Sequence, residues 1–101
     1  MIIINKNNFN YILTNLGYEV EPEFKFCKTR KFRADWKVSK NNKIVLVEYE
    51  GIFANKSRHT SIIGYTNDTE KYNLMAKLGY KCLRYTSKNF NDVINDIEEI
   101  L

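Results

Sequence analysis

The sequence predicts a small α/β domain in which a mixed β-sheet is flanked by helices, and three features of the sequence lead to this prediction. Apolar residues recur at helical spacing near both ends of the chain, and a capping-box spacing predicts a further helix in the second half. Two strand-like stretches separated by a polar turn predict a β-hairpin. A helix between this hairpin and the next strand implies a crossover connection, and hence a mixed sheet. The expected order is α-β-β-β-α-β-α, within one domain that spans residues 1–101.

The first half of the chain contains signals for a helix, an edge strand and a hairpin. Gly17 follows a stretch of helical spacing and marks a helix end. Pro22 places the next stretch at the edge of the sheet, because proline has no N–H to donate to the hydrogen-bond ladder of a central strand. The stretch that follows alternates apolar and charged residues, and its predicted apolar face consists of Phe32, Ala34, Trp36 and Val38. We therefore expect a helix near residues 6–16, an irregular edge strand or loop over 18–27, a strand over 31–38, a turn over 39–43 and a strand over 44–50.

The second half of the chain predicts two helices with a strand between them. Asn67, with Glu70 three residues later, has the spacing of a capping box, and Gly79 marks the end of the helix that this box would open. Apolar residues at helical spacing form a stripe near the C-terminus. In chain order we expect a mobile loop over residues 51–65, a helix over 67–78, a strand over 80–86 and a final helix capped by Ser87 or Asn89.

The composition excludes several broad classes of protein. Hydrophobic residues make up 44% of the sequence and aromatic residues 14%, which is untypical of a disordered chain. No apolar run approaches the roughly 18 residues of a membrane span, and the opening residues 1–4 are too short for the apolar part of a signal peptide. Cys27 and Cys82 stand in ordinary apolar contexts, so we expect two buried thiols in a reducing, cytoplasmic compartment rather than a disulfide.

The net charge of +4 is modest, but it is unevenly distributed. Residues 24–43 hold one acid, Asp35, and eight basic residues, whereas residues 89–101 hold acids and no base. The eight basic residues are Lys25, Lys28, Arg30, Lys31, Arg33, Lys37, Lys40 and Lys43. A basic face on an intracellular domain suggests nucleic acid as the partner. A solvated, lysine-rich hairpin is the alternative.

Three carboxylates come together at the end of the predicted hairpin. In "KIVLVEYEG", residues 43–51, an apolar strand ends in Glu48 and Glu50, which lie on the same side because side chains alternate along a strand. The hairpin brings Asp35 of the preceding strand close to them. Oxygen ligands of this kind suit a hard divalent cation such as Mg²⁺ or Mn²⁺, which would remove the mutual repulsion of the acids. The alternative is a set of surface acids paired with nearby lysines.

The spacing D-x(12)-E-x-E resembles the core of the PD-(D/E)xK nuclease superfamily, in which an acid on one strand precedes E-x-K on the next. Four blocks extend this resemblance: "RKFRADW" at 30–36, "VEYEGIF" at 47–53, "SRHT" at 57–60 and "EKYNLMAKLGYKCLRYT" at 70–86. In this order they are similar to blocks of small phage and prophage nucleases, and less closely to those of very-short-patch repair endonucleases.

The resemblance implies a restriction-endonuclease-like fold and a DNA endonuclease that hydrolyses phosphodiester bonds with Mg²⁺ or Mn²⁺. It implies Asp35 and Glu48 as metal ligands, and Glu50 as a third ligand or as the group that orients the attacking water. So small a domain would recognise DNA structure, such as branches, nicks or single strands, rather than a long sequence. Enzymes of this kind often dimerise, so a homodimer is open. A phage-encoded enzyme of this kind would act inside the host cell.

Glu50 is the main departure from the family pattern, because the superfamily usually has lysine there. Activity is then either lost or supported by a lysine from elsewhere. Lys71 is the candidate, because its predicted helix packs over the end of the sheet. A lysine here would position or activate the attacking water and stabilise charge in the transition state. The alternative is an exposed helix lysine paired with an acid such as Glu70.

His59 is the only histidine of the chain and lies in a polar loop after the acid-bearing strand. We expect it to act as a general base for water or as a proton donor to the leaving group, with a structural or exposed role as the alternative. Arg58 would clamp a phosphate, and Ser57 replaces the family's glycine beside it. For Arg84, pairing with an acid is the alternative to phosphate contact. The remaining residues predicted to bind nucleic acid are Arg30, Lys31 and Arg33.

Two other functions are open at the level of the sequence. One is a non-catalytic nucleic-acid-binding domain that keeps the nuclease fold while Glu50 leaves its metal site inactive. The other is a small interaction or inhibitor protein whose basic hairpin meets an acidic protein surface.

Overall fold

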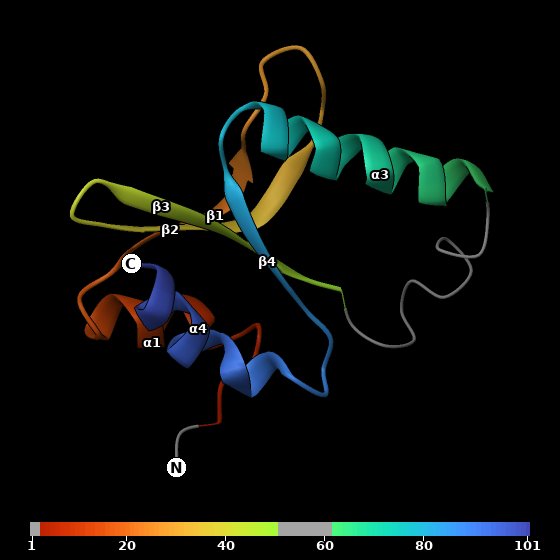
Figure 1. The fold of residues 1–101 in the computed structure, drawn as a ribbon. Helices are drawn as coiled ribbons and strands as arrows, with labels where there is room; N and C mark the ends of the chain where they lie inside the picture. The colour runs from red at the N-terminus through yellow and green to blue at the C-terminus, as the bar shows by residue number, and fades with distance from the viewer. Residues whose placement is uncertain (1–2, 51–61) are drawn as a thin grey trace.

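A four-stranded mixed sheet with the strand order β1-β2-β3-β4 lies between helices (Figure 1). The structure, a computed structural model, describes residues 3–50 and 62–101. The pairs β1–β2 and β2–β3 are antiparallel, and the pair β3–β4 is parallel. Over residues 3–50 and 62–101 the α-helices and strands follow the expected order α-β-β-β-α-β-α. The elements are α1 (Phe9–Asn15), β1 (Glu19–Lys25), β2 (Arg33–Lys40), β3 (Lys43–Tyr49), α3 (Ile62–Lys77), β4 (Lys81–Tyr85), the short 3₁₀ helix η1 (Phe90–Asp92) and α4 (Val93–Ile100).

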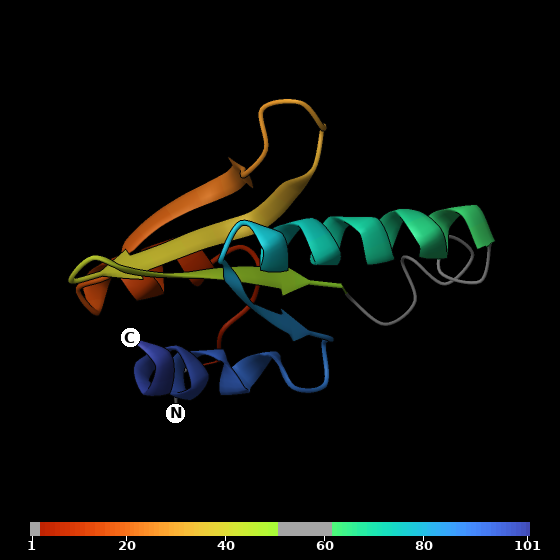
Figure 2. The same ribbon diagram turned by 45° about the horizontal axis from the view of Figure 1, so that its top comes forward.

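The helices cover the two faces of the sheet unequally. Figures 1 and 2 show α1 and α4 together on one face and α3 on the other. The central strand β3 is buried on both faces, and Val45 to Glu48 are four buried residues in succession. Val45 and Val47 belong to the cluster under α1 and α4, whereas Leu46 packs with Met75 of α3. Side-chain alternation along β3 therefore directs Glu48 to the α3 face.

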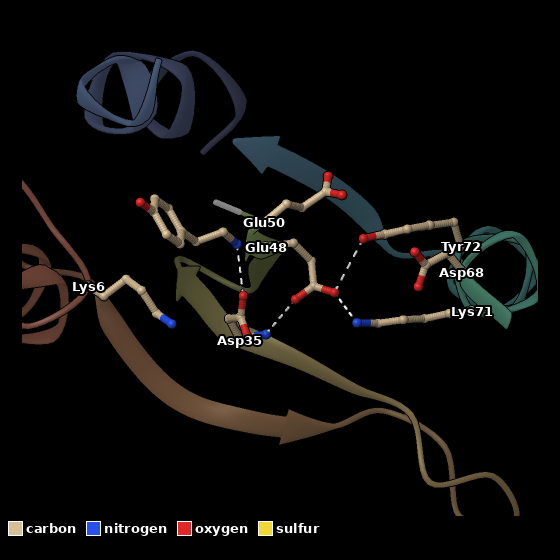
Figure 3. A pocket seen from close by; sticks show the side chains of 8 residues that line it. Lys6, Asp35, Glu48, Glu50, Asp68, Lys71 and Tyr72 are labelled. Carbon is tan, nitrogen blue, oxygen red and sulfur yellow. Dashed lines mark hydrogen bonds and ion pairs between the residues drawn. The ribbon is translucent and has the colours of Figure 1, made fainter. Parts of the chain in front are cut away.

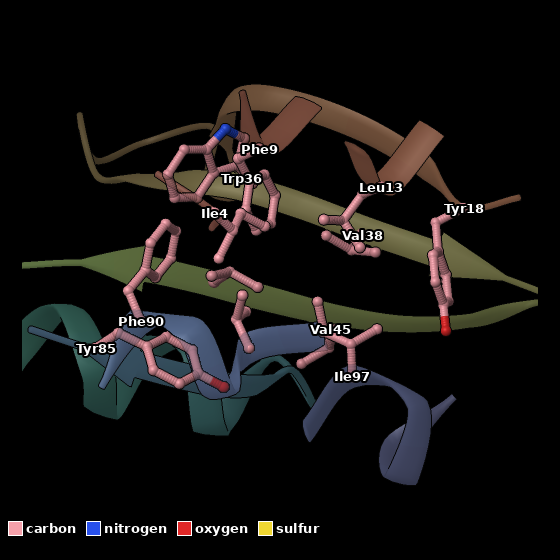
Figure 4. Close-up of a cluster of buried hydrophobic side chains, with 12 residues drawn as sticks. Ile4, Phe9, Leu13, Tyr18, Trp36, Val38, Val45, Tyr85, Phe90 and Ile97 are labelled. Atoms are coloured by element: carbon pink, nitrogen blue, oxygen red, sulfur yellow. The ribbon is translucent and has the colours of Figure 1, made fainter. Parts of the chain in front are cut away.

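The cluster under α1 and α4 contains an aromatic stack that fixes the first helix to the sheet (Figure 4). The ring of Phe9 lies 4.1 Å from that of Trp36 and 5.8 Å from that of Phe90, centroid to centroid. Phe9 is fully buried. Such ring pairs add about 0.5–1.5 kcal/mol to the burial of their apolar area. This face of the sheet therefore supplies much of the packing that holds the strands in place.

The β2–β3 turn is tighter than the sequence predicts. It consists of Asn41 and Asn42, with φ of 54° and 67°, and the strands extend to Lys40 and Lys43 on either side. Two successive residues with positive φ form a type I′ turn, which suits the twist of a hairpin and tolerates asparagine. The turn fixes the register in which Lys40 lies opposite Lys43 and Trp36 opposite Val47.

Two expectations from the sequence are wrong in detail. The helix α3 begins at Ile62, so residues 62–65 are helical rather than loop, and the supposed capping box at Asn67 lies inside the helix. No residue between 62 and 66 forbids a helix, since a single Gly64 is tolerated at a modest cost. Residues 51–61 of the expected loop lie outside the described residues.

The face of β2 changes along the strand. Trp36 and Val38 pack under α1 and α4 as expected, but Ala34 and Phe32 join the cluster on the α3 face. Ala34 and Trp36 are two residues apart and would share a face in a regular strand. Between their partners Phe24 and Pro22 on β1 lies Glu23, whose φ is 53°, so the β1–β2 ladder is irregular at this point.

Several smaller expectations can be compared directly with the structure. β1 is an edge strand, as Pro22 predicts, and Gly17 and Gly79 end their helices with positive φ. Cys27 and Cys82 are half-buried free thiols. No helix in residues 3–50 or 62–101 is long and apolar enough to cross a membrane.

Candidate functional site

The site begins where the backbone ladder between β2 and β3 ends. Trp36 and Val47 are the last paired residues of the two strands. Beyond them two carboxylates replace backbone acceptors: the N–H of Asp35 donates to Glu48 Oε2 at 2.9 Å, and the N–H of Tyr49 donates to Asp35 Oδ2 at 2.8 Å. Each carboxylate therefore accepts a hydrogen bond from the backbone of the neighbouring strand, and both are fixed in position where the ladder ends.

Glu48 is the one charged side chain among the described residues that is buried, with 3% of its surface exposed. Burial raises the pKa of its carboxyl above the ordinary value of 4.5, and Lys71 counteracts part of this rise. The Lys71 ammonium contacts Oε1 of Glu48, and the hydroxyl of Tyr72 lies 3.4 Å from the same oxygen. Figure 3 shows Asp35 and Lys71 on either side of Glu48, at the junction of β2, β3 and α3.

Glu50 has a different partner from Glu48. Its carboxylate accepts two bonds from the guanidinium of Arg84, at 2.8 Å from Nε and 3.0 Å from Nη2. The guanidinium also lies 3.9 Å from the centroid of the Tyr72 ring. The parallel pairing of β3 with β4 places Arg84 opposite Glu48, one residue pair before the end of that ladder. Arg84, which was predicted to contact phosphate, is thus held by a carboxylate and an aromatic ring. Pairing with an acid was the alternative expected from the sequence.

A polar pocket of about 260 Å³ brings these groups together. The three acids predicted from the sequence and Lys71 all line it. Four lining residues were not predicted as site residues, namely Lys6, Tyr49, Asp68 and Tyr72. Asp68, Lys71 and Tyr72 lie at helical spacing on one side of α3, and this spacing was the available signal for Asp68. Lys6 comes from the segment before α1, and nothing in its local sequence connects it with the pocket.

The other predicted site residues lie apart from the pocket or outside the described residues. Arg30 pairs with Glu70 of α3 at 3.0 Å, so Glu70 is not the partner of Lys71. Arg33 pairs with Glu23 at 3.1 Å on the surface, and Lys31 is exposed in the loop between β1 and β2. Arg58 and His59 lie outside the described residues.

The donor chemistry of the pocket suits a hard cation better than a soft one. Asp35 and Glu48 present carboxylate oxygens, and neither cysteine lines the pocket. Within residues 3–50 and 62–101, however, no three His, Cys, Asp or Glu side chains are grouped closely enough to hold a metal ion as they stand. The expected trio of acids therefore shares one pocket, while Glu48 is bonded to Lys71 and Glu50 to Arg84.

Comparisons of the chain with known protein families, with curated proteins and with solved structures found no match. The chemistry of the pocket is therefore the basis for assigning a function.

Proposed function

We propose that this chain is a metal-dependent DNA endonuclease with a restriction-endonuclease-like fold, and that its active site is the pocket at the end of β2 and β3. The observation that carries the proposal is the contact between Lys71 of α3 and Glu48, beside Asp35. Two acids and a lysine at a strand end are the groups that the PD-(D/E)xK pattern combines. Here the lysine comes from a helix, and the strand position where the pattern has lysine is Glu50.

Asp35 and Glu48 fit a divalent cation such as Mg²⁺ or Mn²⁺. Both carboxylates are already oriented by backbone N–H groups, so little side-chain freedom would be lost on binding. The burial of Glu48 raises the free energy of its ionised form, and a nearby cation would lower it. Such a cation would activate water and neutralise charge on a phosphodiester.

The chain's own cations would complete the site. The Lys71 ammonium lies at the pocket and can stabilise negative charge that develops on a phosphoryl oxygen or orient the water. Arg84 is positioned by Glu50 and Tyr72 at the rim of a neighbouring pocket, where its planar guanidinium can meet a phosphate. Lys28 and Lys31 in the loop after β1 have no ion-pair partner among the described residues and would attract the DNA backbone.

Cleavage of supercoiled and branched DNA, with Mg²⁺, Mn²⁺ or a chelator, tests the proposal. We expect metal-dependent cutting by the unmodified protein and none above background by Asp35→Asn. The asparagine keeps an oxygen that accepts from the Tyr49 N–H, so this variant separates loss of the charge from loss of the fold. Lys71→Met should lower the rate about 100- to 1000-fold.

Lys77→Met is the matched control for Lys71→Met, because Lys77 is an exposed lysine of the same helix that does not line the pocket. We expect it to cut DNA at the unmodified rate. The proposal would be wrong if the unmodified protein cut none of these DNAs with either metal, or if Asp35→Asn cut as fast as the unmodified protein.

A non-catalytic DNA-binding domain is the second candidate. It is favoured by the engagement of the acids with protein donors, since Lys71 and Arg84 already hold Glu48 and Glu50. This candidate predicts equal DNA binding by the unmodified protein and by Asp35→Asn, measured by gel shift at low salt, with cutting by neither. Absence of DNA binding at low salt would exclude both candidates.

A further inference from the structure

We propose that Lys71 is an internal counter-ion of Glu48, and that a divalent cation binds this pocket by displacing the Lys71 ammonium from the carboxylate. This inference rests on the proposed function, because it concerns the same pocket. It goes further because it predicts that Lys71 lowers the affinity for the metal, whereas a residue that assists metal binding would raise it.

The two oxygens of Glu48 have different surroundings. Oε2 accepts the Asp35 N–H at 2.9 Å and is thereby used to join β2 to β3. Oε1 is the oxygen that Lys71 contacts, with the Tyr72 hydroxyl 3.4 Å away. A cation that enters the pocket therefore meets Glu48 at the oxygen where the Lys71 ammonium already lies (Figure 3).

Two positive charges at one carboxylate oxygen repel each other strongly in a partly desolvated site. The side chain of Glu48 is 4% exposed and that of Lys71 is 18% exposed, so solvent screens this repulsion only weakly. Lysine carries a compact charge on a flexible four-carbon stem, so its ammonium can move within the pocket while its backbone stays in α3. One charge must therefore leave Oε1 when the other arrives.

Displacement would also place the lysine where the proposed reaction needs it. While bonded to Glu48, the ammonium is used to neutralise a buried acid. Once released, it remains beside the same pocket and can contact a phosphate oxygen. The alternative arrangement keeps Lys71 on Glu48 throughout, where it would orient the carboxylate and assist metal binding.

Mn²⁺ affinity without DNA distinguishes these arrangements, because it does not depend on activity. Calorimetric titration of Lys71→Met and Lys71→Gln should show Mn²⁺ binding at least about tenfold tighter than in the unmodified protein, which corresponds to about 1.4 kcal/mol. Lys77→Met should bind like the unmodified protein. Methionine keeps the apolar stem, and glutamine also keeps an N–H donor for Oε1, so at least one variant should remain folded.

The melting temperature provides a second readout. Without metal, Lys71→Met should melt lower than the unmodified protein, because it leaves a buried carboxylate without its partner. With Mn²⁺, its melting temperature should rise more than that of the unmodified protein.

Equal or weaker Mn²⁺ binding by both Lys71 variants, with measurable binding by the unmodified protein, would overturn the counter-ion proposal and leave the proposed function standing. Binding only by the variants would support it. Absence of binding in all proteins at millimolar Mn²⁺ would overturn both proposals.

Discussion

The two faces of the sheet use the same central strand in different ways. Toward α1 and α4, β3 presents Val45 and Val47, which pack in an aromatic and aliphatic cluster. Toward α3, it presents Leu46 and then Glu48, which is buried with only 3% of its surface exposed. The first face is apolar throughout, whereas the second changes from apolar to charged within two residues.

This difference shows how a small domain can bury a carboxylate without losing its core. The hydrogen-bond donors to Glu48 come from other elements, namely the N–H of Asp35 in β2 and the side chains of Lys71 and Tyr72 in α3. The apolar face needs no such donors and provides the packing that keeps them in position. Substitutions on each face, together with substitutions at the surface, test this division between a stabilising face and a site-bearing face.

Phe9→Ala should have the largest effect, because it removes a fully buried ring that stacks on Trp36 at 4.1 Å. We expect the free energy of unfolding to fall by about 3–5 kcal/mol. Tyr11→Ala, in the same helix, removes a ring that is 74% exposed and should change it by no more than about 0.5 kcal/mol. Urea unfolding measures both, and similar values for the two variants would contradict the assignment of this face.

Asp35→Ala should cost less, about 1–3 kcal/mol, since it leaves the Tyr49 N–H without its acceptor at a partly buried position. Asp35→Asn keeps an acceptor oxygen and should be closer to the unmodified protein in the same urea experiment. If the alanine and asparagine variants were equally stable, the bond from Tyr49 would contribute nothing to the fold.

Glu48→Gln should change the dependence of stability on pH. Burial raises the pKa of Glu48 above 4.5, so the folded state holds its proton at pH values where the unfolded state has lost it. The unmodified protein should therefore lose stability relative to Glu48→Gln as pH rises above 4.5, by about 1.4 kcal/mol per pKa unit of the shift. Urea unfolding from pH 4 to 8 measures the difference, and a constant difference would contradict the raised pKa.

Arg33→Ala should have the smallest effect. Its ion pair with Glu23 lies at the surface, with side chains that are 59% and 74% exposed. Solvent screens such a pair, so we expect a change of no more than about 0.5 kcal/mol in the free energy of unfolding. A loss of several kcal/mol would show that the edge strand depends on this pair.

The centre of the site could be predicted because local rules fix it. Alternation places Glu48 and Glu50 on one side of β3, and the hairpin brings Asp35 beside them. Lys71 was predicted from its position in the helix that covers the end of the sheet, and its contact with Glu48 agrees with that placement. The placement of the acids needs only strand periodicity and a tight turn, whereas Lys71 was sought because the resemblance to the PD-(D/E)xK pattern implies a lysine where this chain has Glu50.

The remaining contacts depend on distances between elements that no local rule sets. Arg84 meets Glu50 because of the register between two parallel strands, which a long crossover connects and no tight turn fixes. Lys6 lines the pocket although it lies near the N-terminus, far in sequence from the other lining residues. The start of α3 at Ile62 directly follows Ser61, a residue type preferred at helix N-caps, but position 64 is glycine where a capping box would have Glu or Gln.

The turn at Asn41 and Asn42 determines which residues can form the pocket. Equal lengths of strand separate Asp35 and Glu48 from this turn, and the spacing of twelve residues between the two acids follows from that symmetry. One residue added to the turn could slip the register and send Asp35 to the opposite face of the sheet. Insertions at this exposed turn, usually the most tolerated kind, would then abolish the pocket from a position remote from it.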